Sequence, residues 1–208
     1  MKPLPRLYTI ADSSFGDPVR LAESLFEGGS RLVQVRNKTG SARELLYQVD
    51  RILSSAPEDA TIIVNDRTDV TLAAGAGGVH LGQTDLPPAL AREILGPNSM
   101  IGISTHSFEQ ASEASRLPVD YIAVGPIFST TTKKNPDPVI GIEGLAAICK
   151  VTGKPIVAIG GIKLDRVVEV LQAGASSIAV IRDVLDTPDI AARVQHWIDV
   201  LKQVEPRG

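Results

Sequence analysis

The sequence predicts a single (β/α)8 TIM barrel, an α/β fold formed by one domain over residues 1–208. Two observations predict it. Short apolar runs alternate eight times with segments in which apolar residues have helical spacing. Polar residues follow nearly every apolar run, as they do at the functional end of such barrels. An open doubly wound sheet shows the same alternation but seldom needs eight regular units, so we favour the barrel.

The predicted strands and helices follow one another without a linker or a second domain. The strands begin near Leu7, Leu32, Thr61, Gly78, Met100, Tyr121, Ile156 and Ser177. The helices span residues 18–27, 41–53, 69–74, 87–95, 107–116, 142–151, 165–173 and 189–203. Ser41 lies three residues before Glu44, and Ser107 three before Gln110, which is the spacing of helix N-caps.

The composition excludes several classes of protein. A net charge of −3 gives no electrostatic basis for binding nucleic acid. The single cysteine, Cys149, excludes an intrachain disulfide. No apolar run is long enough for a signal peptide or a transmembrane helix. We therefore predict a cytoplasmic protein with small-molecule substrates and neither nucleic acid nor a membrane as partner.

The second predicted strand carries polar side chains toward the barrel mouth. Strand alternation places Gln34 and Arg36 on one face, with Val33 and Val35 on the other. The valines suit the helix-covered outside, so Gln34 and Arg36 face inward, and Lys38 follows the strand. Buried polar groups need partners. An anionic or heteroaromatic ligand would supply them, and so would an internal salt bridge to Asp66 or Asp85.

Two aspartates follow neighbouring strands. Asp66 comes after the third strand and Asp85 after the fourth, so their carboxylates can approach each other over the barrel. Beside three cations, Arg36, Lys38 and Lys133, this pair favours Mg²⁺ held between acidic side chains and substrate phosphates. The alternative is a carboxylate–lysine network that only holds the loops.

Two further segments suit phosphate. The stretch from Gly125 to Lys134 reads Gly-Pro-Ile-Phe-Ser-Thr-Thr-Thr-Lys-Lys, and its hydroxyl and ammonium groups suit anionic oxygens. An ordinary Ser/Thr-rich surface loop would look similar. Gly160-Gly161 and Arg182 follow strands seven and eight, where barrels of this kind recurrently bind phosphate. Two anion sites indicate two phosphorylated substrates.

The histidines do not indicate a hydrolase. Ser104 faces the mouth if Met100 and Gly102 do, but the sequence places neither His80 nor His106 to complete a Ser-His-Asp triad. His80 also lacks an acidic, Cys or His neighbour at metal-ligand spacing. We therefore predict no hydrolase nucleophile.

The spaced motifs together resemble the thiamine phosphate synthase family. They are Gln34–Lys38, Asn65-Asp66, Gly78–Asp85, Gly102–Ser104, Gly125–Lys133 and Ala158–Ile162. The resemblance covers essentially the whole chain, and the motifs occur in the family's order. Several spaced motifs in one order are far more specific than any one of them.

The resemblance implies a transferase of thiamine biosynthesis. Such an enzyme joins 4-amino-2-methyl-5-(diphosphooxymethyl)pyrimidine to thiazole phosphate and releases thiamine phosphate and pyrophosphate. It implies a Mg²⁺-dependent, dissociative route through a pyrimidine cation.

The resemblance also assigns residues to roles. Those implied for the pyrimidine pyrophosphate are Gln34, Arg36, Lys38, Asn65, Ser104 and Lys133, of which Arg36, Lys38, Ser104 and Lys133 are the catalytic set. Those implied for the thiazole phosphate are Thr130, Thr132, Gly160, Ile181 and Arg182, and Thr131 is implied as a further substrate-binding residue. Asp66 and Asp85 are the implied metal ligands.

One position departs from the family pattern. Arg182 stands where the family usually has a small serine, and a cation there would either add to phosphate binding or fill the site. Two other readings are a thiazole tautomerase-like homologue and a non-catalytic phosphate-binding regulatory barrel. The paired aspartates, the Thr130–Lys133 loop and the cations Arg36 and Lys38 favour the synthase.

Overall fold

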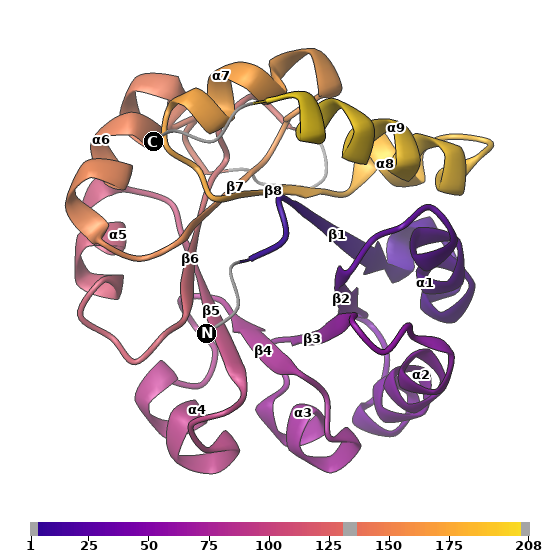
Figure 1. Cartoon of the computed structure of the whole chain (residues 1–208). Helices are drawn as coiled ribbons and strands as arrows, with labels where there is room; N and C mark the ends of the chain where they lie inside the picture. The colour runs from indigo at the N-terminus through magenta and orange to yellow at the C-terminus, as the bar shows by residue number, and fades with distance from the viewer. Residues whose placement is uncertain (1–3, 131–136, 205–208) are drawn as a thin grey trace.

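Eight parallel strands close into a barrel in the computed structural model, which describes residues 4–130 and 137–204. Each strand pairs with the next in sequence order, and β8 pairs back onto β1, with Leu7 opposite Ile178. Figure 1 looks into the ring of strands, with the helices arranged around it. The predicted (β/α)8 barrel is confirmed.

The strands are β1 (Leu7–Asp12), β2 (Leu32–Arg36), β3 (Thr61–Asn65), β4 (Gly78–Leu81), β5 (Met100–Thr105), β6 (Tyr121–Val124), β7 (Ile156–Ile159) and β8 (Ser177–Val180). The α-helices are α1 (Pro18–Glu27), α2 (Ala42–Ser55), α3 (Thr68–Ala74), α4 (Pro88–Leu95), α5 (Phe108–Ala114), α6 (Gly141–Thr152), α7 (Val167–Gln172), α8 (Arg182–Leu185) and α9 (Ile190–Gln203). Two short 3-10 helices are η1 (Ser13–Phe15) and η2 (Leu164–Arg166).

The elements differ from the predicted ones mainly in the last two units. The helix predicted over 165–173 is divided into η2 and α7. Strand β8 ends at Val180, because Ile181 has φ −119° and ψ −82° and so leaves the extended conformation. The chain turns there directly into α8, a short helix that the sequence analysis did not predict.

Local capping explains where two of the helices begin. The Ser41 hydroxyl accepts a hydrogen bond from the Glu44 backbone N–H at 3.2 Å, and Ser107 does the same for Gln110 at 3.2 Å. Each serine satisfies a donor that the first helical turn leaves unpaired. Both predicted N-caps are confirmed.

The barrel separates two apolar layers. Val33 and Val35 point outward into the large core between strands and helices. Leu32, Ile63 and Val157 point into the smaller core inside the barrel. The predicted alternation of β2 is therefore confirmed, because Gln34 lies between Leu32 and Arg36 on the inner face.

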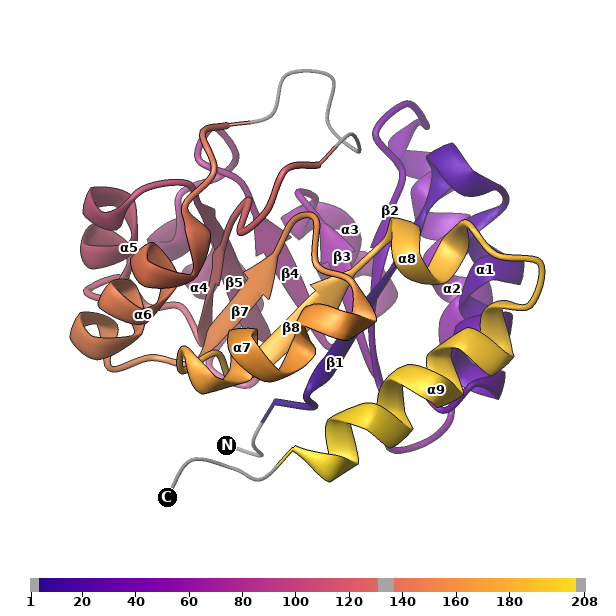
Figure 2. The same ribbon diagram turned by 90° about the horizontal axis from the view of Figure 1, so that it is seen from above.

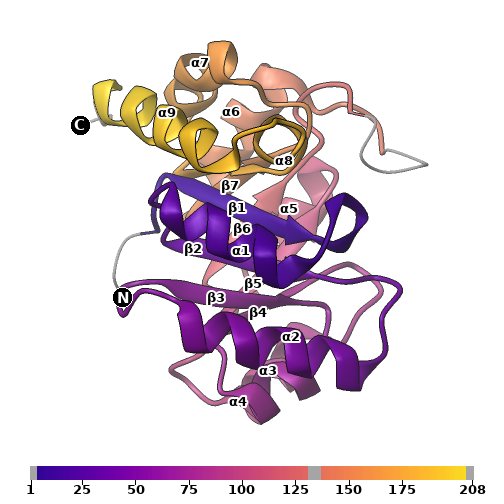
Figure 3. The same cartoon turned by 90° about the vertical axis from the view of Figure 1, so that its right-hand side faces the viewer.

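The helices position the ends of the strands. Figure 3 shows α1 and α9 against β1, and α9 buries Trp197 in the outer core. Figure 2 shows the barrel from the side, with the loop after β2 and the short helix α8 at the same end. No helix among residues 4–130 and 137–204 is both long and apolar enough to cross a membrane.

The buried indole of Trp197 yields a stability prediction. Its Nε1–H donates to the Asp183 carboxylate at 2.8 Å, and Arg193 donates to the same oxygen at 2.7 Å. Asp183→Ala leaves the buried N–H unpaired, so we expect the free energy of unfolding to fall by about 2 kcal/mol. Urea denaturation measures it.

Asp186→Ala is the matched control, because Asp186 is exposed and forms an ion pair with half-exposed Arg182. We expect that variant to lose less than about 0.5 kcal/mol. Equal losses in the two variants would contradict the role given to Asp183.

Candidate active site

A cavity of about 670 Å³ lies at the carboxyl ends of the strands. It is lined by Gln34, Arg36, Lys38, Asn65, Asp66, Asp85, Ser104, Thr130, Gly160, Ile181 and Arg182. The structure thus brings together every predicted site residue that it describes. Thr131, Thr132 and Lys133 lie outside the described residues.

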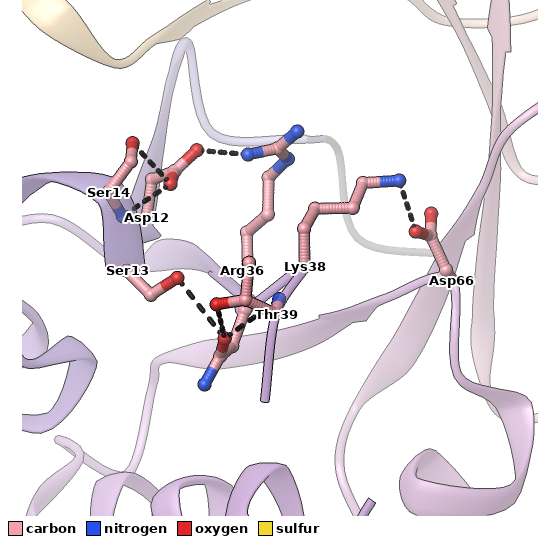
Figure 4. A network of polar contacts seen from close by, with 8 residues as sticks. Asp12, Ser13, Ser14, Arg36, Lys38, Thr39 and Asp66 are labelled. Atoms are coloured by element: carbon pink, nitrogen blue, oxygen red, sulfur yellow. Dashed lines mark hydrogen bonds and ion pairs between the residues drawn. The ribbon is translucent and has the colours of Figure 1, made fainter. Parts of the chain in front are cut away.

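Arg36 is held by a buried carboxylate. Its Nη1 donates to Asp12 Oδ2, and Asp12, with 1% of its side chain exposed, is the residue opposite Arg36 in the β1–β2 register. The Ser14 backbone N–H and hydroxyl bind the other Asp12 oxygen at 2.9 and 2.7 Å. Figure 4 shows Arg36, at the end of β2, pointing toward Asp12, and Lys38, just after the strand, pointing toward Asp66. The alternative of an internal salt bridge therefore applies to Arg36, but its partner is Asp12 and not Asp66 or Asp85.

Lys38 pairs with the first predicted metal ligand. Its Nζ lies 2.5 Å from Asp66 Oδ2, and the lysine side chain is 52% exposed. Asp66 has φ 63°, a left-handed conformation that few residues other than glycine adopt. Its backbone N–H donates to the His80 carbonyl at 2.8 Å. Strand β4 thus holds the strained residue at the cavity wall.

The carboxylates of Asp66 and Asp85 repel each other. Partial burial raises the pKa of Asp85, and the nearby Asp66 carboxylate raises it further. The Gly82 N–H, which donates to Asp85 Oδ2 at 2.6 Å, and the Lys38 ammonium oppose this shift in pKa. A cation between the two carboxylates would relieve the repulsion.

The two carboxylates suit magnesium better than they suit an ion that protein ligands enclose completely. Among residues 4–130 and 137–204 no three His, Cys, Asp or Glu side chains gather at one point. Mg²⁺ prefers oxygen ligands, keeps several waters and takes substrate phosphates as ligands, so two carboxylates suffice for it. The pair fits the predicted ion.

Ser104 and Gln34 are anchored inside the barrel. Ser104 Oγ lies 2.8 Å from His80 Nε2, and Gln34 Nε2 donates to the Tyr8 hydroxyl at 2.9 Å. His80 Nδ1 contacts the Tyr121 hydroxyl at 2.9 Å. The serine–histidine contact was not predicted, but a tyrosine stands where a triad requires an acid, which agrees with the predicted absence of a hydrolase nucleophile.

The loop after β6 is joined to the glycine turn after β7. The Ile127 N–H donates to the Ile159 carbonyl at 3.0 Å, and the Phe128 N–H to the Gly160 carbonyl at 2.9 Å. Gly161 has φ 67°, and a Cβ there would lie 2.4 Å from the Ser129 carbonyl oxygen. The turn therefore requires glycine, and the close packing brings Thr130 and Gly160 to one wall of the cavity.

Arg182 has partners within the protein. Its Nη1 lies 3.1 Å from Asp186 Oδ2, and its guanidinium carbon lies 5.3 Å from the centre of the Phe15 ring. The side chain is half exposed and lines the cavity. A contact between this guanidinium and the thiazole phosphate stays a prediction.

The sequence analysis missed three residues that organise the site. Asp12 ends β1, so the rule applied to the other strand ends would have found it. Tyr8 and Tyr121 lie on the inner face among apolar residues, where sequence alone makes them look like ordinary core aromatics. Their hydroxyl contacts join different strands and have no spacing signal in the sequence.

The fold and the cavity define a (β/α)8 barrel protein whose mouth combines carboxylates, cations and a glycine turn. The family model of thiamine monophosphate synthase matches residues 7–184, and the chain belongs to this family. Proteins with this activity are transferases, so the resemblance and the predicted class of enzyme are confirmed.

Individual relatives agree with the family. The thiamine-phosphate synthase of Koribacter versatilis is 47% identical over 95% of this chain and 96% of its own length. That of Chlorobium phaeovibrioides is 43% identical over 89% and 88%. The solved thiamine phosphate pyrophosphorylase from Pyrococcus furiosus superposes with a TM-score of 0.87 at 37% identity, covering 95% of this chain and 96% of that one.

Buried His80 predicts acid sensitivity. Burial lowers its pKa to about 4; the Asp66 carboxylate opposes this and the Lys38 ammonium adds to it. An unfolded histidine titrates near 6.5, so between these values the unfolded chain binds the extra proton and stability falls as the pH falls. From pH 7 to pH 5 this group removes about 2 kcal/mol of the free energy of unfolding.

Urea denaturation of the wild type and of His80→Gln at both pH values measures this contribution. Other titrating groups are common to the two proteins and cancel in the comparison. We expect the variant to lose about 2 kcal/mol less on acidification. The same loss in both proteins would contradict the assignment.

Proposed function

We propose that the chain catalyses the formation of thiamine phosphate from an aminopyrimidine methyl pyrophosphate and thiazole phosphate, with release of pyrophosphate. The single observation that carries the proposal is the set of charged groups that gather at the mouth of the barrel, in a chain of this family. Arg36, Lys38, Asp66 and Asp85 meet there on one side of a 670 Å³ cavity, opposite the Gly160 turn. The proposed substrates need a pyrophosphate site and a phosphate site in one cavity.

The pyrimidine pyrophosphate would lie over β2 to β5. Gln34, Asn65 and Ser104 offer neutral hydrogen-bonding groups to its ring, and Arg36 and Lys38 offer charge to its phosphates. Arg36 has further N–H groups beyond those that face Asp12. By resemblance Lys133 would add a third cation to the pyrophosphate.

Asp66 and Asp85 would hold Mg²⁺ at this end of the cavity. When bound, the ion would supply positive charge to the pyrophosphate oxygens as negative charge grows on them. The aspartates would orient that charge, and the Gly82 N–H would keep Asp85 turned toward the cavity. Lys38 would then be released from Asp66 to contact the phosphates.

Bond breaking and bond making can be separate steps. The carbon–oxygen bond to pyrophosphate breaks, and its electron pair leaves with the pyrophosphate. The electron-rich aminopyrimidine stabilises the cation that remains. The thiazole nitrogen donates its lone pair to that carbon, and the positive charge ends on the thiazolium ring. Arg36 and Lys38 stabilise the leaving group, while the cavity aligns the two rings.

The thiazole phosphate would bind beside the Gly160 turn. Thr130 and Gly160 share this wall of the cavity with Ile181 and Arg182. Backbone N–H groups at a glycine turn and a helix start suit phosphate. By resemblance Thr131 and Thr132 belong to the same site.

The predicted cytoplasmic location stays a prediction.

The proposed reaction predicts a simple requirement for substrates and metal. Purified protein with both substrates and Mg²⁺ should form thiamine phosphate and pyrophosphate in equal amounts, detected by chromatography and a phosphate assay. EDTA should abolish turnover, and added Mg²⁺ should restore it. A tautomerase or a regulatory barrel would form no thiamine phosphate.

Asp85→Asn should lower kcat by about a hundredfold or more, the scale on which a key electrostatic contact acts. Asp69→Asn is the matched control, because Asp69 is exposed and pairs with Arg67 outside the cavity. Full activity in EDTA, or equal effects of the two variants, would contradict the role of the metal.

Replacing Lys38 and replacing Arg36 should affect stability and catalysis differently. Lys38→Ala removes a half-exposed ion pair, so we expect a change of less than about 1 kcal/mol in stability. We expect a fall of at least tenfold, or about 1.4 kcal/mol, in kcat/KM for the pyrimidine pyrophosphate. Arg36→Ala should lower both quantities, because it leaves Asp12 buried without its cation.

Thermal unfolding and steady-state kinetics on each variant separate the two effects. Lys202→Ala, at an exposed lysine on α9, controls for the loss of a charge. A destabilised Lys38→Ala protein with normal kinetics per folded molecule would mean that Lys38 serves only the loops.

A further inference from the structure

A chain of hydrogen bonds crosses the interior of the barrel beneath the cavity. It runs from Gln34 on β2 through Tyr8 on β1, Tyr121 on β6 and His80 on β4 to Ser104 on β5. Its four contacts measure 2.9, 2.9, 2.9 and 2.8 Å. Five strands thus contribute one residue each. Gln34, Tyr8, His80 and Ser104 line the cavity, whereas Tyr121 lies behind them and is not among its lining residues.

The three middle members are buried. Tyr8 is 1% exposed, Tyr121 0% and His80 8%. The interiors of such barrels are filled mainly by branched apolar side chains, and buried polar groups stabilise a fold only when they are fully hydrogen-bonded. Apolar side chains would be enough to fill the barrel. The hydrogen-bonded side chains therefore indicate a function for the two groups at the ends, Gln34 and Ser104.

Because the Gln34 amide nitrogen faces Tyr8, only one direction of the hydrogen-bond chain leaves no buried hydrogen unpaired. Gln34 Nε2 donates to Tyr8, so the single Tyr8 hydroxyl hydrogen is available for Tyr121. Tyr121 then donates to His80 Nδ1, and His80 donates from Nε2 to Ser104. In the reverse direction the Tyr8 hydrogen would have no partner inside the barrel.

This direction decides what each end offers to a ligand. The Ser104 hydroxyl accepts from His80, so its own hydrogen is free to be donated into the cavity. The Gln34 amide nitrogen is engaged, and its carbonyl oxygen accepts no hydrogen bond from the residues that the structure describes. The cavity therefore presents an acceptor on β2 and a donor on β5.

Gly102 on β5 leaves space for the hydrogen-bonded side chains. A Cβ on Gly102 would lie 2.0 Å from Cζ and 2.4 Å from the hydroxyl oxygen of Tyr121, its neighbour across the β5–β6 register. The Tyr8 and Tyr121 rings meet edge to face at 5.9 Å, and His80 stacks on Tyr121 at 5.6 Å. These contacts hold the three rings in place.

We infer that Tyr8, Tyr121 and His80 are positioning residues that fix Gln34 as a hydrogen-bond acceptor and Ser104 as a donor toward the pyrimidine substrate. An aminopyrimidine carries an amino donor and ring-nitrogen acceptors, and pyrophosphate carries acceptors, so this pair of groups matches it. The inference rests on the proposed function and adds to it the internal residues that orient the site.

Tyr121→Phe tests the inference, because it removes only the hydroxyl that joins Tyr8 to His80. We expect kcat/KM for the pyrimidine pyrophosphate to fall about tenfold, the effect of one lost hydrogen bond. KM for the thiazole phosphate should change less than about twofold, since that site lies across the cavity. Thr105→Val is the matched control: its buried hydroxyl donates to the Ala123 carbonyl at 3.0 Å, and we expect normal kinetics.

A double-mutant cycle separates positioning from packing. If Tyr121 acts through Ser104, then Tyr121→Phe should lower kcat/KM by less than about twofold in a Ser104→Ala background. A full tenfold loss in that background would overturn the inference, and so would unchanged kinetics of Tyr121→Phe itself or an equal loss in Thr105→Val.

Two further outcomes are distinguishable. If Tyr121→Phe does not fold, Tyr8→Phe makes the same test at the other end, where its effect should disappear in a Gln34→Ala background. If the wild type makes no thiamine phosphate, the proposed function and the inference fall together. If the wild type turns over and the cycles are additive, only the inference falls.

Discussion

The pairing of β8 with β1 is the interaction on which the rest of the structure depends. It joins the first and last strands of the sheet, so all eight carboxyl ends surround one mouth. Arg6, just before β1, donates to the carbonyls of Leu201 and Val204 and so ties the end of α9 to the start of the sheet. Closure leaves no strand edge unpaired, which is the most secure protection of a parallel sheet.

Two pairs of a cation and a carboxylate lie on one side of that mouth. On the side of β1 to β4 every described cation has an acidic partner, and the two pairs differ in kind. Lys38 and Asp66 form a partly exposed ion pair that contributes little to stability, so a phosphate can displace the carboxylate with little loss of free energy. Arg36 and buried Asp12 form a pair that is costly to break. One cation is therefore free to change partners and the other stays in place.

Much of the site could be predicted because strand order and alternation are local properties. The inward direction of Gln34 and Arg36 follows from a period of two residues, and the approach of Asp66 to Asp85 from the adjacency of β3 and β4. The turn of the backbone at Ile181 into α8 was not predicted, because an apolar residue after a strand looks like a continuation of that strand.

Contacts across the barrel could not be predicted in the same way. Tyr8 and Tyr121 are far apart in the sequence and lie on strands that are not neighbours in the sheet. Whether a tyrosine hydroxyl finds a partner there depends on the packing of the whole interior. The partner of Arg36 was likewise missed, because Asp12 belongs to a strand whose end was not considered.

Asp12 also changes the thermodynamics of binding at Arg36. A free arginine side chain has about 2 kcal/mol of rotamer entropy to lose when it is immobilised. Here the carboxylate, itself held by Ser14, immobilises the guanidinium when the chain folds. A phosphate that arrives later meets an ordered donor. The side-chain entropy has already been lost on folding, so it does not reduce the free energy of binding.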